Sequence, residues 1–234
     1  MRTNLVCLIL LGASLPVGAQ TAQIDNRLIV RPWVELKPLV RIDNDEHGNT
    51  LSASTPHPIP VAKAERALLE DARVLLSGMV YGWSFDYTPA NRARQVAETF
   101  TLTPTAQIPW GSPRLRVVET EAADEKLWAR TSYSMDDAES ARRASWESSA
   151  ADLSQGEGKA SAMKGPEAKM LSFQDAVRDA IRLDLRTRYL DAPRQIRGDV
   201  VLWEDPMAAV RSGMYRTVVK VKIVVRELVP YRIF

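Results

Sequence analysis

The chain has 234 residues, of which 45% are hydrophobic and 26% charged, and its formal net charge is +2. A chain of this length and composition can bury a core as one domain or two small ones, and wholesale disorder is not expected. Because acidic and basic residues are interspersed along the sequence, no basic footprint for nucleic acid or for an anionic membrane surface is expected.

The first 19 residues have the pattern of a secretory signal peptide. Arg2 supplies the positive charge, an apolar run follows over residues 5–15, and a small-residue site predicts cleavage after Ala19. The run is shorter than the roughly 20 residues that a spanning helix needs. The only cysteine, Cys7, lies inside the run, where it does not suit lipid attachment. We therefore expect a periplasmic or secreted protein without a membrane span or lipid anchor, and a mature chain without thiols.

An edge strand is predicted near the start of the mature chain. Between Leu28 and Ile42, apolar residues and prolines occupy the even positions, which is typical of a strand with one buried face. Pro32 and Pro38 have no N–H to donate to a neighbouring strand, so we place this strand at a sheet edge or at a bulge.

The segment over residues 43–60 is rich in turn-forming residues and is expected to be a loop that leads into a helix. It contains both histidines of the chain, His47 and His57. Neither has a carboxylate at ligand spacing, so no metal site is predicted there.

An amphipathic helix is predicted from Val61 to about Ser77, with Gly78 as its terminator. An aromatic strand over residues 79–89 follows. Its aromatic side chains share one face and are interpreted as part of the core. A small-ligand pocket that uses Trp83 and Tyr87 stays open as an alternative.

A β-hairpin and a short helix come next. Residues 114–121 and 127–135 read as two strands joined by a turn. Asp136, followed by Glu139 three residues later, forms the pattern of a capping box at the start of a polar helix. The cluster that these two residues form with Asp137 resembles a set of metal ligands, but capping explains it without a metal.

Residues 151–171 are rich in serine, alanine, glycine and lysine, and we expect a flexible linker. They include the stretch QGEGKAS, in which Gly156 and Gly158 are only two positions apart. A phosphate-binding loop needs its glycines, lysine and hydroxyl residue at fixed spacing between a buried strand and a helix, and this stretch does not match. No nucleotide or other cofactor is predicted.

A second helix is predicted from Ser172, as its N-cap, to Tyr189. A strand over residues 197–206 and a long, half-buried strand over residues 215–228 follow it. A similar short pattern follows each of the two predicted helices, so a degenerate duplication stays open as an interpretation. The matching patterns are Gly78-x-Val80-x-x-Trp83 and Gly198-x-Val200-x-x-Trp203.

These patterns predict an α+β fold in which two main amphipathic helices pack on antiparallel sheet, with a repeated helix and β-hairpin unit as a possible origin. The predicted organisation is a signal peptide (1–19), an edge strand and loop (20–60), a first α/β half (61–150), the linker (151–171) and a second α/β half (172–234).

Residues 153–225 resemble the small α/β envelope modules of the flagellar-assembly lipoprotein family, and they are also similar to the N-terminal module of the flagellar protein FlgT. The resemblance lies in the order of three features: GEGKAS, the alanine-studded helix FQDAVRDAIRLDLRTRYL, and a strand that starts RGDVV. It implies a non-catalytic part or assembly factor of an envelope machine, with the flagellum as the candidate machine, and makes QGEGKAS the lead from a strand into a helix.

The functional prediction is an exported, non-catalytic structural or assembly module of the bacterial cell envelope, with an envelope protein complex as partner. Unpaired strand edges and exposed aromatic tails favour strand addition. The candidate partner contacts are Val229, Tyr231, Ile233 and Phe234.

Two other functions stay open. A secreted hydrolase would use a pair of carboxylates, for which Asp86, Glu119 and Glu204 are the candidates near strand ends. A periplasmic binder of small ligands would use the aromatic pocket named above. No catalytic, cofactor-binding or metal-ligating residue is assigned.

Overall fold

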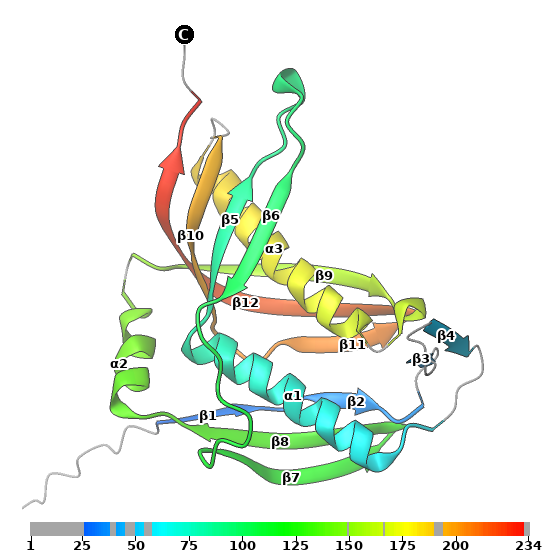
Figure 1. Cartoon of the computed structure of the whole chain (residues 1–234). Coiled ribbons are helices and arrows are strands. Elements are labelled where there is room, and N and C mark those ends of the chain that lie inside the picture. Colours follow the sequence, from blue (N-terminus) through cyan, green and yellow to red (C-terminus); the bar gives the residue numbers. More distant parts are fainter. Residues whose placement is uncertain are drawn as a thin grey trace, which may run out of the picture.

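The structure is a computed structural model, and it describes residues 26–37, 41–44, 50–53, 58–148, 150–165, 167–189 and 194–231 (Figure 1). The predicted signal peptide, both histidines and the last three residues of the tail lie outside these ranges.

The described residues form an α+β fold, as predicted, with antiparallel sheets packed by helices. The helices are α1 (Val61–Val80), α2 (Asp137–Ser145) and α3 (Ala168–Arg188), with single 3-10 turns at Arg92–Arg94 and Ala162–Lys164. A four-stranded sheet contains β1 (Arg27–Val30), β2 (Trp33–Glu35), β7 (Leu115–Ala123) and β8 (Lys126–Ser134). A six-stranded sheet contains β5 (Trp83–Thr88), β6 (Thr99–Pro104), β9 (Asp152–Ser161), β10 (Gln195–Leu202), β11 (Met207–Arg211) and β12 (Met214–Val229).

In the four-stranded sheet, β8 is central. It pairs with β7 on one side and with both β1 and β2 on the other, always antiparallel. The predicted hairpin is thus confirmed, and so is the edge position of the N-terminal segment. The prediction of one strand from Leu28 to Ile42 was wrong. Pro32 has no N–H to give, and the main-chain N–H of Arg31 instead donates to Asp205, so the strand breaks between β1 and β2.

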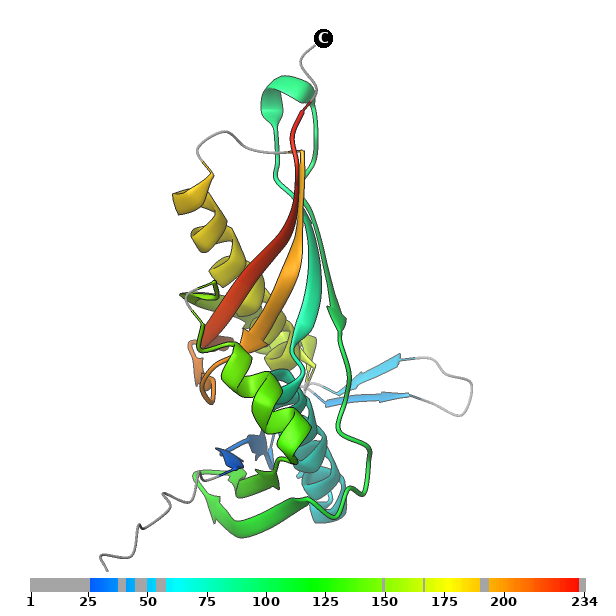
Figure 2. The same cartoon turned by 90° about the vertical axis from the view of Figure 1, so that its left-hand side faces the viewer.

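A third, two-stranded unit follows the edge strands. β3 (Arg41–Asn44) pairs with β4 (Thr50–Ala53) inside the segment that was expected to be partly strand and partly loop. This hairpin projects away from the body of the protein (Figure 2).

In the six-stranded sheet, β12 is the strand that joins the others. It pairs with β9 along one side and with β11 and then β10 along the other, and β5 and β6 continue the sheet beyond β10. The predicted long strand over residues 215–228 is confirmed. β5 belongs to the first predicted half and β10 to the second, so the two halves share one sheet.

The predicted flexible linker is instead the strand β9, which is paired with β12 over its whole length. Gly156 and Gly158 are buried where β9 crosses α3. A Cβ on Gly158 would overlap the main chain of Ser172 and Ala176, and Gly156 is as close to Ala180. The glycines therefore let a strand lie directly against a helix, with no phosphate involved.

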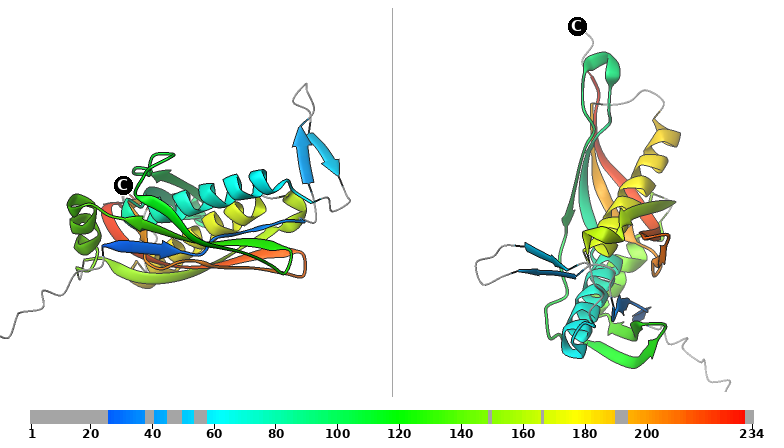
Figure 3. Two further views of the ribbon diagram at one scale, coloured as in Figure 1. Left: turned by 90° about the horizontal axis from the view of Figure 1, so that it is seen from below. Right: turned by 90° about the vertical axis from the view of Figure 1, so that its right-hand side faces the viewer.

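The two long helices lie side by side, α1 over the four-stranded sheet and α3 over the six-stranded sheet (Figure 3). The main core fills the space between them and the strands. The aromatic strand is part of this core, as predicted, because Trp83, Phe85 and Tyr87 are at most 6% exposed. The ring of Trp83 packs on Phe173 of α3, with 5.8 Å between ring centroids.

Two predicted helix boundaries were wrong. Gly78 does not end α1, which continues to Val80. Its missing Cβ instead leaves room for the ring of Trp83. The turn is made by Gly82, whose φ is +69°. Ser172 is not an N-cap but lies inside α3, where its hydroxyl and that of Thr217 share a hydrogen bond of 2.6 Å.

The two glycine-valine-tryptophan patterns have different conformations. Gly78 and Val80 lie in α1, whereas Gly198 and Val200 lie in β10. The two patterns therefore match in sequence but not in structure, and they do not support the duplication. The strand predicted over residues 197–206 ends at Leu202, and β11 forms in the loop that was expected to follow it.

Candidate functional site

The two sheets turn one strand edge toward each other. In Figure 1, β2 and β11 run in the same direction with the edge of one facing the edge of the other. Two hydrogen bonds cross between them: the indole Nε1 of Trp33 donates to the carbonyl of Ala208 at 3.3 Å, and the N–H of Arg31 donates to the carboxylate of Asp205 at 2.8 Å. Among the described residues no main-chain ladder joins β2 to β11.

The turn after β11 determines which of its main-chain groups point outward. Ser212 and Gly213 both have positive φ, 51° and 70°, as a two-residue type I′ turn requires. The flanking pair, Arg211 and Met214, therefore exchanges hydrogen bonds, and the pairs alternate from there. It follows that Ala208 and Val210 turn their N–H and C=O groups away from β12, and the indole bond to Ala208 agrees with this.

A groove of about 470 Å³ opens beside this edge. We call it the Trp33 groove. Its principal lining residues are Arg31, Trp33, Trp128, Met207, Arg211 and Arg216. Met207 is 67% exposed, and Trp128 is half-buried, so the groove offers apolar surface that the protein itself does not cover.

Trp33 anchors the floor of the groove. It is 3% exposed and lies against Trp128 and Tyr215, with ring centroids 5.8 and 6.2 Å away. The ammonium groups of Lys126 and Lys169 lie 4.4 and 4.7 Å from its centroid, within cation–π range. Lys169 also donates to the main-chain carbonyl of Trp33 and pairs with Asp71 on α1.

A tyrosine and a carboxylate link the two sheets below the groove. The hydroxyl of Tyr215 on β12 donates to Glu35 of β2 at 2.8 Å. Burial, and then this hydrogen bond, raise the pKa of Tyr215, so its phenol stays protonated. Burial likewise raises the pKa of Asp205, although the Arg31 N–H and the charge of Lys169 oppose the change.

The mouth of the groove carries unbalanced positive charge. Within the described part of the chain, the guanidinium groups of Arg31 and Arg211 form no ion pair. Arg216 is 3.9 Å from Glu157, which also pairs with Lys159 at 3.2 Å. The groove therefore combines a free strand edge, apolar rings and spare cationic groups.

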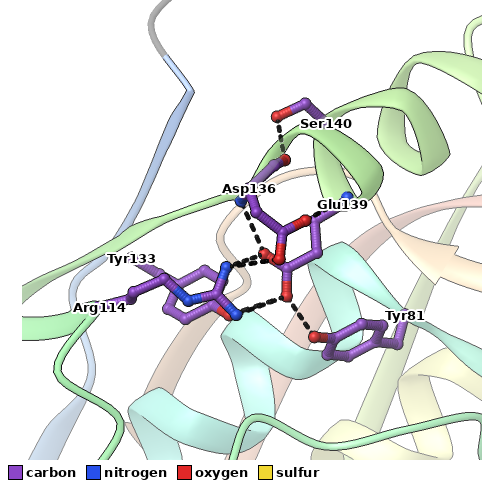
Figure 4. A network of polar contacts seen from close by, with 6 residues as sticks. All are labelled: Tyr81, Arg114, Tyr133, Asp136, Glu139 and Ser140. Atoms are coloured by element: carbon purple, nitrogen blue, oxygen red, sulfur yellow. Dashed lines mark hydrogen bonds and ion pairs between the residues drawn. The ribbon is translucent and has the colours of Figure 1, made fainter.

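A second polar cluster has a buried carboxylate at its centre (Figure 4). Glu139 of α2 is 5% exposed and accepts hydrogen bonds from Tyr81, from Tyr133 at 2.9 Å and from both terminal nitrogens of Arg114 at 2.6 and 3.2 Å. It also completes the predicted capping box with Asp136. The cluster ties α2 to the end of α1, to β8 and to the segment before β7.

The acidity of Glu139 follows from these partners. Burial raises its pKa, but the hydrogen bonds from Tyr81, the main chain of Asp136, Tyr133 and Arg114 outweigh burial, so its pKa lies below the ordinary value. Burial and the bond to Glu139 raise the pKa of Tyr133. Contacts within the cluster satisfy the hydrogen-bonding groups of these four side chains, as expected for residues that stabilise the fold.

The predicted C-terminal contacts are only partly within the described residues. Val229 is the last residue of β12, and its carbonyl accepts the N–H of Arg194. Tyr231 is half-buried, with the guanidinium carbon of Arg94 4.3 Å from its ring centroid. Ile233 and Phe234 lie outside the described residues.

The candidate carboxylates are held apart on different elements. Asp86 on β5 accepts from Gln195 and Arg197, and Glu204 after β10 accepts from Lys220. Glu119 lies on the exposed strand β7 of the other sheet. Trp83 and Tyr87 are packed in the core, so they do not line an open pocket.

Neither a metal site nor a membrane-spanning helix is found among the described residues. No group of three or more histidine, cysteine or acidic residues there has the arrangement of a metal site. None of the helices in those ranges has the length and hydropathy needed to cross a bilayer.

The sequence analysis missed the groove. The signal for β11 was present, since the short run MAAVR and the strand that begins MYRTVV are separated by two residues, Ser212 and Gly213, as in a tight hairpin. No local signal connects Trp33 to β11, because the two lie 175 positions apart.

The fold and the groove define the class as an α+β protein with antiparallel sheets, two of which bring a strand edge to the Trp33 groove. A protein-family model that carries no functional description matches residues 16–231, and the chain belongs to that uncharacterised family. It is similar to an uncharacterized protein of Treponema pallidum (strain Nichols), with 27% identity over 206 residues that cover 86% of this chain and 80% of the relative. No solved structure matches the chain.

Proposed function

We propose that the chain is an exported, non-catalytic structural or assembly module of the bacterial cell envelope, and that it binds a partner protein along the Trp33 groove. The outer edge of β11 beside the groove carries the proposal, since Ala208 and Val210 turn their main-chain donors and acceptors away from β12. Among the described residues, only the Ala208 carbonyl has a hydrogen-bond partner there, the indole of Trp33. An unpaired strand edge is a template for an added strand. Export follows from the predicted signal peptide, with cleavage after Ala19 and a periplasmic or secreted location.

The partner is an envelope protein complex. The resemblance of residues 153–225 to flagellar-assembly modules places the flagellum first among the machines to be tested. Lipid anchoring is not part of the proposal, because the only cysteine lies within the predicted signal peptide.

Site-specific photo-crosslinking in intact cells of the native host tests the function. A photoreactive amino acid replaces Met207 at the groove, and in a matched control it replaces Met163, which is 68% exposed and does not line the groove. A third position, Tyr231, tests the C-terminal tail. We expect a subunit of the flagellum or of another envelope complex to crosslink to position 207 and not to position 163. Equal amounts of the same crosslinked protein at positions 207 and 163, or no crosslinked protein at position 207, would contradict the proposal.

A further inference from the structure

The chemistry of the Trp33 groove restricts what can occupy it. A strand that adds to β11 has two faces, because its side chains alternate. One face would lie over the half-buried ring of Trp128, beside the buried ring of Trp33. The other would lie with Met207 and Arg211, which project from the solvent face of β11 together with Arg216 on β12.

Charge distinguishes the second face. The guanidinium groups of Arg31, Arg211 and Arg216 outnumber the two carboxylates that line the groove, Glu157 and Asp205, and the charge of Arg31 already interacts with Asp205. Of the two carboxylates, Asp205 also accepts an N–H, and Glu157 is shared with Lys159. A cationic rim attracts a segment that carries carboxylates and repels a basic one.

We propose that the groove binds an extended, acidic segment of a partner protein, in which acidic and apolar residues alternate, and that this segment adds as a strand to the edge of β11. The inference rests on the proposed function as a protein-binding module. Main-chain pairing with Val210 and with the N–H of Ala208 supplies affinity, because the Ala208 carbonyl already accepts the indole of Trp33. The arginine rim supplies the preference for acidic sequence.

Fluorescence anisotropy with labelled peptides of about ten residues tests the inference, since this length matches an ordinary strand. The probe alternates glutamate and valine. One control alternates lysine and valine, and the other alternates glutamate and proline, which keeps the charge but cannot pair as a strand. We expect the glutamate–valine peptide to bind the protein at least about tenfold more tightly than either control.

Two variants locate the contact. Arg211→Glu reverses an exposed charge at the rim, and Val210→Pro removes an outward N–H from an edge strand, a position where proline is tolerated. Each is expected to weaken binding of the glutamate–valine peptide by about tenfold. Arg116→Glu on β7, outside the groove, is the matched control and leaves binding unchanged. Circular dichroism verifies that each variant is folded.

Each other outcome overturns the inference in a specific way. Equal binding of the glutamate–proline peptide shows that charge alone is recognised, and equal binding of the lysine–valine peptide shows that the rim does not select. Binding that survives Arg211→Glu places the contact elsewhere. If an acidic polysaccharide binds and no peptide does, the partner is a carbohydrate and not a protein. If no peptide binds but position 207 still crosslinks to an envelope protein, the acidic strand is wrong and the proposed function stands.

Discussion

Glu139 is the residue on which the attachment of α2 depends. Its buried carboxylate accepts from two tyrosines and an arginine, so Glu139→Gln removes the charge that Arg114 faces while keeping a similar shape. We expect the free energy of unfolding to fall by about 2 kcal/mol, the cost of weakening hydrogen bonds to a buried charged group, while Asp136 still pairs with Arg114. Urea denaturation measures the change. Asp137→Asn in the same helix turn is the control, and an equal loss there would argue against a special role for Glu139.

The same carboxylate gives a pH dependence. Because the pKa of Glu139 is lower in the folded protein than its ordinary value of 4.5, the ionised form stabilises the fold. This contribution is complete above about pH 4.5 and is lost as the pH falls through the folded-state pKa. The stability difference between wild type and Glu139→Gln should therefore shrink below about pH 4.5. A difference that stays constant down to about pH 3 would contradict this account.

Arg143 fixes α2 from its other end. Its guanidinium donates to the carbonyls of Met79, Leu202 and Trp203 and lies 4.4 Å from the ring centroid of Trp203. Lysine cannot reproduce this planar fork, so Arg143→Lys should cost about 2 kcal/mol of unfolding free energy. Arg142→Lys, at the exposed neighbouring position, should cost less than about 0.5 kcal/mol. Similar losses in thermal denaturation of the two variants would show that the fork is unimportant.

At the scale of elements, the contact of β9 with α3 depends on the absence of side chains. In Gly158→Ala the new methyl group meets the main chain of α3, which must move away. We expect a loss of about 3 kcal/mol in urea denaturation, the upper part of the range for overpacking. Lys159→Ala, next in the strand and exposed, should change stability by less than about 0.5 kcal/mol. A neutral effect of Gly158→Ala would mean that the strand and helix separate easily.

Elements with a strong local pattern could be predicted from the sequence. The cores of α1 and α3, the hairpin of β7 and β8, the capping box and β12 all follow from periodicity or capping residues. β9 could not, because its glycines are favourable only when α3 is already beside them. The groove depends on two segments that are distant in sequence, so a pattern read along the chain cannot find it.

At the scale of the whole molecule, Trp33 couples the two sheets. It belongs to β2, yet it packs on Tyr215 of β12 and donates to β11. Trp33→Ala should lower the free energy of unfolding by about 3–5 kcal/mol, the usual cost of emptying such a buried site. Unfolding followed by far-UV circular dichroism and by fluorescence should coincide in the wild type and separate in the variant. A loss below about 1 kcal/mol would show that the sheets are joined elsewhere.

The length of β12 has a consequence for how the chain reaches its native state. This strand follows β5, β9, β10 and β11 in the sequence, and it pairs directly with the last three. During synthesis β9 and β11 have no partner strand until residues 214–229 are made, and β10 has only β5. Pairing so late and over such separations is slow and leaves strand edges exposed in the meantime. Under the proposed export, late synthesis of β12 would keep the nascent chain open for threading through a translocation channel until that strand has been made.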